Sequence, residues 1–278
     1  MEQLKGTETK DAADMENWHS VLEKYGFSDI QPLSKLLKSA DGEHCYWKAD
    51  YNGVSCFIKC RKSLDSLKKE YKAMDKLSKL YPEYFPKTLL HTDLSGNRKF
   101  LAIEYINGDV LTADLIEQSS DEKRKRIFDS IYNIALILYE NKMIHRDFNC
   151  DNLMVQEDGT TKLFDFQHVL GEDLPEDELN IQNPKRLRGT NKKLRPAPYT
   201  WDDMYSAYHI LQMFERYDIP EYTEKMNNIK SKIGNLRNDF LQNKFPLSTY
   251  LNYKCFIFYK IYGIFQKCFY KVLQVEIS

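Results

Sequence analysis

The stretch His145-Arg146-Asp147-Phe148-Asn149-Cys150-Asp151-Asn152, followed later by Asp165-Phe166-Gln167, decides how the whole chain is interpreted. Between these segments lie two short apolar runs, at 153–155 and 162–164, joined by the turn residues Glu157-Asp158-Gly159. This pattern predicts a β-hairpin that brings Asp165 back beside Asn152. Two carboxylates and an amide held close together can bind metal ions and accept a proton.

The first stretch resembles the catalytic loop H-R-D-x-x-x-x-N of the protein-kinase superfamily, and Asp165-Phe166-Gln167 resembles its D-F-G motif. The resemblance implies an α+β, bilobal, protein-kinase-like fold, with a small β-rich N-lobe containing one helix and a larger, mainly helical C-lobe. It implies that Asp147 accepts or orients the proton of a substrate hydroxyl and that Arg146 stabilises the loop. It also implies that Asn152 and Asp165 hold Mg²⁺, so the expected cofactors are ATP and Mg²⁺.

The resemblance extends upstream to an apolar strand, 54–59, that ends at Lys59. In the family this lysine binds the α- and β-phosphates of ATP and forms an ion pair with a helix carboxylate. Glu70, on the following helix, is the candidate for that carboxylate. A solvated lysine at a strand end is the alternative. The buried strand 100–106 runs into Asn107-Gly108, and the segment 103–108 resembles the hinge that binds adenine through its backbone. The resemblance makes Glu104 and Ile106 the expected contacts.

Of two further family motifs, the glycine-rich loop is missing from this sequence and the aspartate element of the large lobe is present. No G-x-G-x-x-G sequence occurs, and only Gly42, in the turn 39–43, stands where the phosphate-binding loop is expected. Asp203-Met204-Tyr205-Ser206 resembles the family element whose aspartate braces the catalytic loop. The alternative for Asp203 is an acidic residue favoured at a helix N-terminus by the helix dipole.

The hydrophobic patterns predict how the chain is organised. Strands and one helix (63–80) come first, and helical periodicity follows at 121–141 and 201–217. We therefore expect an N-lobe at 15–107 and a C-lobe at 108–278, with the boundary near Asn107-Gly108. Residues 1–14 are polar, without the apolar core of a signal peptide, and are expected to form a flexible leader.

Departures from the kinase motifs bear on the acceptor. Asn149 replaces the lysine usual in Ser/Thr kinases, and Asp151 replaces the arginine found in many tyrosine kinases. The motif D-x-N-x-x-N, from Asp147 to Asn152, is closer to that of lipopolysaccharide sugar kinases, such as the Kdo and heptose kinases. No A-P-E sequence follows Gln167. The expected acceptor is therefore a saccharide or glycolipid of lipopolysaccharide core or another surface glycan. A divergent Ser/Thr protein kinase and a nucleotide-binding pseudokinase scaffold are the alternatives.

Charge and composition bear on partners and location. The net charge of −1 indicates no nucleic-acid partner. A basic run near the predicted site either binds an acidic acceptor or is a solvated loop; it contains Lys185, Arg186, Arg188, Lys192, Lys193 and Arg195. The aromatic and basic segment at about 244–273 is expected to be a helix packed on the C-lobe, with peripheral contact to the inner membrane face as the alternative.

The six cysteines form neither a C-x-x-C pair nor a cluster with zinc spacing. They are expected to behave as small, half-buried apolar residues. Reduced thiols fit the cytosol, so a cytoplasmic location is expected.

Overall fold

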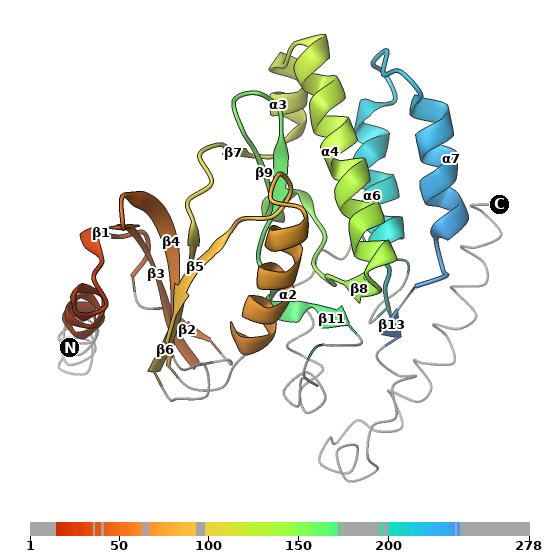
Figure 1. Cartoon of the computed structure of the whole chain (residues 1–278). Coiled ribbons are helices and arrows are strands. Elements are labelled where there is room, and N and C mark those ends of the chain that lie inside the picture. Colours follow the sequence, from red (N-terminus) through yellow and green to blue (C-terminus); the bar gives the residue numbers. More distant parts are fainter. Residues whose placement is uncertain are drawn as a thin grey trace, which may run out of the picture. The chain divides into compact units, whose positions relative to one another are not determined.

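The structure is a computed structural model that describes residues 15–35, 37–39, 42–62, 67–92, 98–171, 174, 194, 196, 200–236 and 238–239. The chain divides into two compact units, residues 1–107 and 108–278 (Figure 1). The first is β-rich and the second is mainly helical, which confirms the predicted α+β class. The leader at 1–14, the six basic residues after Asp165 and the segment 244–273 lie outside the described residues.

The first unit contains an antiparallel sheet in the order β1-β3-β4-β6-β5, with β2 added to β3. Its strands are β1 (Ser28–Pro32), β2 (Leu37–Ser39), β3 (Gly42–Tyr51), β4 (Val54–Lys62), β5 (Thr88–His91) and β6 (Arg98–Glu104). Asn52 and Gly53 join β3 to β4 with φ angles of 51° and 77°. Both angles are positive, as the Asn-Gly pair predicts for a tight hairpin turn, and this turn fixes the register of the two longest strands.

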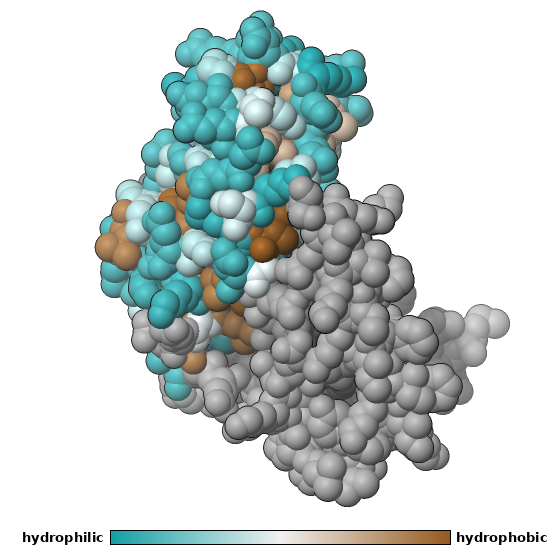
Figure 2. All heavy atoms as spheres, turned by 90° about the vertical axis from the view of Figure 1, so that its right-hand side faces the viewer, coloured by the Kyte–Doolittle hydropathy of each residue, from teal (hydrophilic) through white to brown (hydrophobic). Residues whose placement is uncertain are grey.

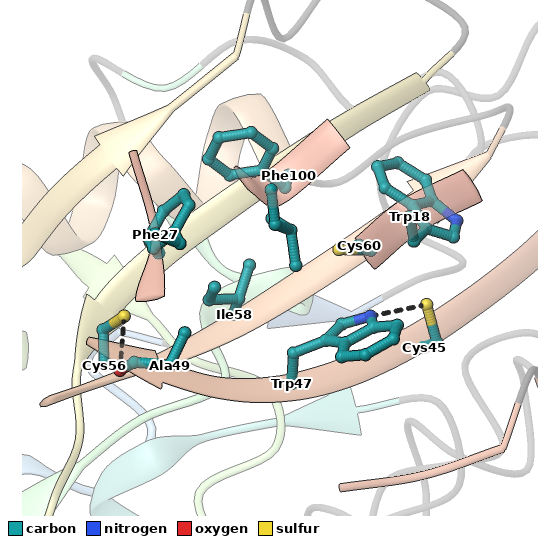
Figure 3. Close-up of a cluster of buried hydrophobic side chains, with 11 residues drawn as sticks. Trp18, Phe27, Cys45, Trp47, Ala49, Cys56, Ile58, Cys60 and Phe100 are labelled. Atoms are coloured by element: carbon teal, nitrogen blue, oxygen red, sulfur yellow. Dashed lines mark hydrogen bonds between the residues drawn. The ribbon is translucent and has the colours of Figure 1, made fainter. Parts of the chain in front are cut away.

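Two helices pack against this sheet. On one face, a helix at 15–24 contributes Trp18 and Leu22 to a buried cluster that also contains Trp47, Ile58 and Phe100 (Figure 3). Helix α2 (Leu67–Leu80) buries an apolar stripe, as its helical spacing predicts. The burial of this stripe fixes the position of α2, which carries Glu70, and β4 carries Lys59.

The second unit is built around a long helix and a small hairpin. The helices are α3 (Ala113–Gln118), α4 (Asp121–Glu140), α6 (Asp203–Leu211) and α7 (Tyr222–Lys232), with short 3-10 turns η1 (Cys150–Asn152), η2 (Phe166–His168) and η4 (Gln212–Phe214). The strands are β7 (Asp109–Val110), β8 (Met143–Ile144), β9 (Leu153–Val155), β10 (Thr161–Leu163), β11 (Leu170–Gly171), β12 (Thr200–Trp201) and β13 (Asn238–Asp239). The helix predicted at 121–141 is confirmed as α4, and its first turn is capped by the Ser120 hydroxyl.

The predicted hairpin at 153–164 is present as β9 and β10, with Leu163 opposite Leu153. Strand β7 adds to β9, and the chain enters it through Gly108. A Cβ atom at Gly108 would lie 2.3 Å from the carbonyl oxygen of Val155, so only glycine permits this close approach. The three-strand sheet therefore gives rigid support to the segment 145–152, which directly precedes β9.

The surface of the described residues is mostly hydrophilic on the side where α7 lies in Figure 1, with a few hydrophobic patches (Figure 2). Within the described part of the chain, no helix has the length and apolar character needed to cross a bilayer.

An ion-pair network joins α4 to α7 and supplies a first test of the fold. Asp129 on α4 accepts hydrogen bonds from Lys125, at 2.7 Å, and from Lys225 of α7, at 2.9 Å. Partial burial opposes ionisation of Asp129, but the two lysines outweigh it and hold its pKa below the ordinary value.

We expect Asp129→Asn to lower the free energy of unfolding by about 1 kcal/mol at neutral pH. Because the folded-state pKa is depressed, this stabilisation is present above the pKa of the unfolded chain and is lost as the pH falls through the folded pKa. Urea unfolding between pH 7 and pH 3 measures the effect. Lys79→Gln, at the exposed Lys79–Asp75 pair, is the control, and a pH-independent difference for Asp129→Asn would contradict the expectation.

Candidate active site

The predicted catalytic loop follows β8 and ends in η1, directly before β9. Its backbone is unusual at Arg146, where φ is 66°, in the left-handed region that non-glycine residues seldom adopt. Two observations show what holds this conformation. The buried Arg146 side chain donates from Nε to the carbonyl oxygen of His168, and its guanidinium lies 5.8 Å from the centre of the Trp201 ring.

Asp147 is held by two amide side chains from its own loop. Asn149 Nδ2 donates to Oδ1 of Asp147 at 2.8 Å, and Asn152 Nδ2 donates to Oδ2 at 3.0 Å. Both amides also donate to the backbone carbonyl of Asp147, at 3.1 and 2.8 Å. Because each carboxylate oxygen has its own donor, the plane of the carboxylate is fixed.

Burial, followed by the negative charge of Asp165, raises the pKa of Asp147 to about 6, although the two amides oppose this shift. A carboxylate that ionises near pH 6 is matched to accepting a proton near neutrality.

The β9–β10 hairpin returns the chain to the loop. The Phe164 amide donates to the carbonyl oxygen of Asn152 at 3.2 Å, which places Asp165 next along the chain. Asp165 has a left-handed backbone, with φ of 65°, and the fully buried Phe166 stacks edge-on against His145. The sequence prediction that the hairpin brings these segments together agrees with this geometry.

The residue types fit a magnesium site. Nδ2 of Asn152 donates to Asp147, so the amide oxygen of Asn152 can serve as a hard metal ligand. Asp165 supplies a carboxylate. No cluster of three or more His, Cys, Asp or Glu ligands occurs among the described residues. Mg²⁺ commonly takes one or two protein oxygens and completes its shell with water and substrate phosphates.

Asp203 reaches the loop from the first turn of α6. Its carboxylate accepts from the backbone amides of His145, at 2.5 Å, and Arg146, at 3.3 Å. Burial raises the pKa of Asp203 to about 7, against the lowering effect of these hydrogen bonds. The contacts are those of a brace beneath the loop, as the family resemblance implies.

The neighbouring Asp202 caps the helix, a role that none of the kinase motifs indicates. Its Oδ1 accepts from the amides of Met204 and Tyr205, and its Oδ2 accepts from Gly234 at 2.6 Å. An aspartate directly before a helix is itself a capping signal. Asp202 therefore anchors the helix that carries the brace.

The remaining predicted residues belong to the first unit. Lys59 Nζ lies 2.6 Å from Glu70 Oε1, and both side chains are almost completely buried. The Glu104 amide donates to Lys87 within the sheet, and Ile106 follows it in a half-buried position. Gly42 begins β3 opposite Ser39, and the turn residues between them lie outside the described residues.

Removing one partner of the Lys59–Glu70 pair is expected to be costly. Lys59→Met should lower the free energy of unfolding by about 3 kcal/mol or more, because the buried Glu70 carboxylate loses its positive partner. The double variant with Glu70→Gln should recover much of that loss, since no uncompensated charge remains. Urea unfolding measures both, with exposed Lys68→Met as the control; equal losses in the single and double variants would contradict the coupling.

Comparison with known proteins adds independent information. A family model described as the RIO domain, an atypical protein-kinase-like family, matches residues 48–179, just under half of the chain. The match includes Lys59, Glu70, the loop from His145 to Asn152, and Asp165.

Three curated relatives are also similar to this chain. A probable serine/threonine-protein kinase of Dictyostelium discoideum is 26% identical over 172 residues, which is 59% of this chain and 24% of that protein. Protein kinase C-like 1B of Caenorhabditis elegans is 33% identical over 82 residues, 28% of this chain and 12% of its own length. MAP kinase kinase MKK1/SSP32 of Saccharomyces cerevisiae is 30% identical over 83 residues, 28% of this chain and 16% of its own length.

The chain thus spans between 12 and 24% of the length of these relatives. All three carry the names of protein kinases, and the RIO domain is kinase-like. The resemblance to lipopolysaccharide sugar kinases gains nothing from these matches and stays a prediction. Together with the geometry of the loop, the comparisons support a kinase.

Proposed function

We propose that this chain is an ATP-dependent kinase that transfers the γ-phosphoryl group to a hydroxyl, with a protein side chain as the first candidate acceptor. The observation that carries the proposal is the Asp147 carboxylate, fixed by Asn149 and Asn152 and accompanied by Asp165 on the returning hairpin. Phosphoryl transfer needs such positioning and charge neutralisation more than covalent chemistry.

Each residue has a defined task in this mechanism. Asp147 accepts the proton of the acceptor hydroxyl at the carboxylate that the two amides orient. Asn152 and Asp165 would hold Mg²⁺, which neutralises phosphate charge when bound. Asp203 keeps the backbone beneath Asp147 in place, and Glu70 holds the Lys59 ammonium in position to bind phosphate oxygens.

The choice of a protein acceptor rests on the names of the three relatives. A saccharide hydroxyl is the second candidate, because Asn149 and Asp151 stand where protein kinases carry basic residues. The structure adds a task for Asn149: its Oδ1 accepts from the Asp151 amide at 2.8 Å while its Nδ2 holds Asp147. Position 149 therefore supports the loop, and this role is compatible with either acceptor.

The test is transfer of labelled γ-phosphate from ATP to a mixed protein fraction, to a glycolipid extract, and to water alone. Label in protein hydroxyls that disappears in Asp147→Asn supports the first candidate, while label confined to saccharide supports the second. Asp151→Asn is the matched control, because this acid is on the same loop but exposed. Nucleotide binding without transfer to any acceptor would overturn the proposal in favour of a scaffold.

A further inference from the structure

Two cysteines face each other across the hairpin of the first unit. Cys45 on β3 and Cys60 on β4 are register partners, so their side chains lie on the same face of the sheet. Directly opposed residues of antiparallel strands have Cα atoms about 4.5 or 5.5 Å apart, and both separations fall within the range of disulfide bonds. The backbone is therefore already placed for a bond between these two sulfurs.

The two thiols also interact with each other and with a tryptophan. The Cys60 thiol hydrogen-bonds to Cys45, and Trp47 Nε1 donates to Cys45 Sγ at 3.2 Å (Figure 3). The Cys45 sulfur thus has a hydrogen-bond donor in the Trp47 ring nitrogen. Burial raises the pKa of the Cys60 thiol well above its ordinary value, so the two sulfurs are chemically unequal.

The third cysteine of this cluster is placed differently. Cys56 pairs with Ala49 across the strands and donates its thiol hydrogen to the Ala49 carbonyl oxygen at 3.1 Å. It has no cysteine as its partner in the register. Only Cys45 and Cys60 are set opposite one another among the cysteines of this sheet that the structure describes.

We propose that Cys45 and Cys60 form an oxidisable pair that hydrogen peroxide converts into a disulfide joining β3 to β4. The Cys45 thiolate attacks one peroxide oxygen, the O–O bond breaks, and the hydroxide released takes up a proton to become water. This leaves a sulfenic acid at Cys45. The Cys60 sulfur then attacks the Cys45 sulfur, the S–O bond breaks, and a second water leaves with the thiol proton. Two thiols lose two electrons, and one peroxide is reduced to two waters.

The burial of the two thiols means that only a small oxidant can reach them. Both cysteines have 0% exposed surface, and Trp18 and Leu22 of the 15–24 helix belong to the same buried cluster. A bulky disulfide reagent has no route to these sulfurs in the closed fold, whereas peroxide is close to water in size. The rate of oxidation should therefore report local opening of the 15–24 helix from the sheet.

The experiment treats the full chain, carrying Cys150→Ser, Cys255→Ser and Cys268→Ser, with hydrogen peroxide and maps its peptides without reduction. The expected product has lost two hydrogens, links the peptides containing Cys45 and Cys60, and reverts with dithiothreitol. Peroxide that adds oxygen separately to the thiols, or a link that includes Cys56, would overturn the proposal. The readout is a mass, so it does not depend on the proposed kinase activity.

A pair of packing variants tests the route of access in the same background. Leu22→Ala should speed formation of the link by about tenfold or more, because it removes buried contacts that hold the helix closed. Exposed Glu23→Ala on the same helix should leave the rate unchanged. If the link forms in urea but not in the folded chain of either variant, the pair is not an oxidation site of the native protein.

Discussion

Replacing Asp147 by asparagine is expected to lower the rate of phosphoryl transfer by about 10³-fold, the scale of a lost general base. The substitution keeps the side-chain volume and removes a carboxylate whose charged form burial disfavours. It also sets one of the two donating amides against an NH2 group, so a loss of stability of about 1–3 kcal/mol accompanies it. Steady-state transfer of γ-phosphate, measured beside urea unfolding, separates the two effects. Asp151→Asn should keep both activity and stability, since that side chain is exposed.

The pH profile gives the same residue a second test. Asp147 must be ionised to accept a proton, so the rate should fall as the pH drops through its pKa of about 6. Mg²⁺ bound at Asp165 would cancel part of the negative charge that raises this pKa, and the acidic limb should then lie at or below pH 6. A rate that stays level down to pH 4 would contradict the assignment of Asp147 as the base.

Asp203→Ala is expected to lower the free energy of unfolding by about 3 kcal/mol or more. The substitution leaves the buried amides of His145 and Arg146 without their acceptor, and each such loss costs roughly 1–3 kcal/mol. Because the same amides set the backbone before Asp147, transfer activity should fall even at temperatures where the variant is folded. Urea unfolding and transfer assays at reduced temperature measure the two losses.

Ser206→Ala is the matched control for Asp203→Ala. Ser206 is a buried polar residue on the same helix, but its hydroxyl donates to the Leu194 and Asp202 carbonyls and does not contact the loop. Asp203→Asn, which keeps one oxygen acceptor, should recover part of the stability. If Ser206→Ala lost as much activity as Asp203→Ala, the brace would have no special connection to catalysis.

The features that sequence predicted well are those fixed by local rules. The Asn52-Gly53 turn, helix α4 and the hairpin at 153–164 follow from turn chemistry and periodicity. The hairpin brings Asp165 back beside the loop. The pairing of Lys59 with Glu70 was predicted from the family resemblance, and the structure places the two atoms at salt-bridge distance. These features could be predicted because they depend on interactions between residues close in the sequence or on specific family motifs.

Features that depend on contacts between distant residues were harder to predict. Asn149 was interpreted only through its departure from the usual lysine, whereas the structure gives it a hydrogen bond to Asp147. The cysteines were expected to be half-buried, yet Cys45, Cys56 and Cys60 are fully buried. One signal for their pairing was present: Cys45 and Cys60 are equally far from the Asn52-Gly53 turn, so a two-residue hairpin sets them opposite.

The left-handed backbone at Asp165 has a consequence for how this protein can be improved or can evolve. Glycine adopts that conformation without the steric cost that a side chain bears, and its presence would also relieve the repulsion between Asp165 and Asp147. Asp165→Gly should therefore raise the melting temperature while removing a proposed metal ligand. A library selected for heat resistance alone would accumulate inactive proteins at this position, so any selection must include turnover.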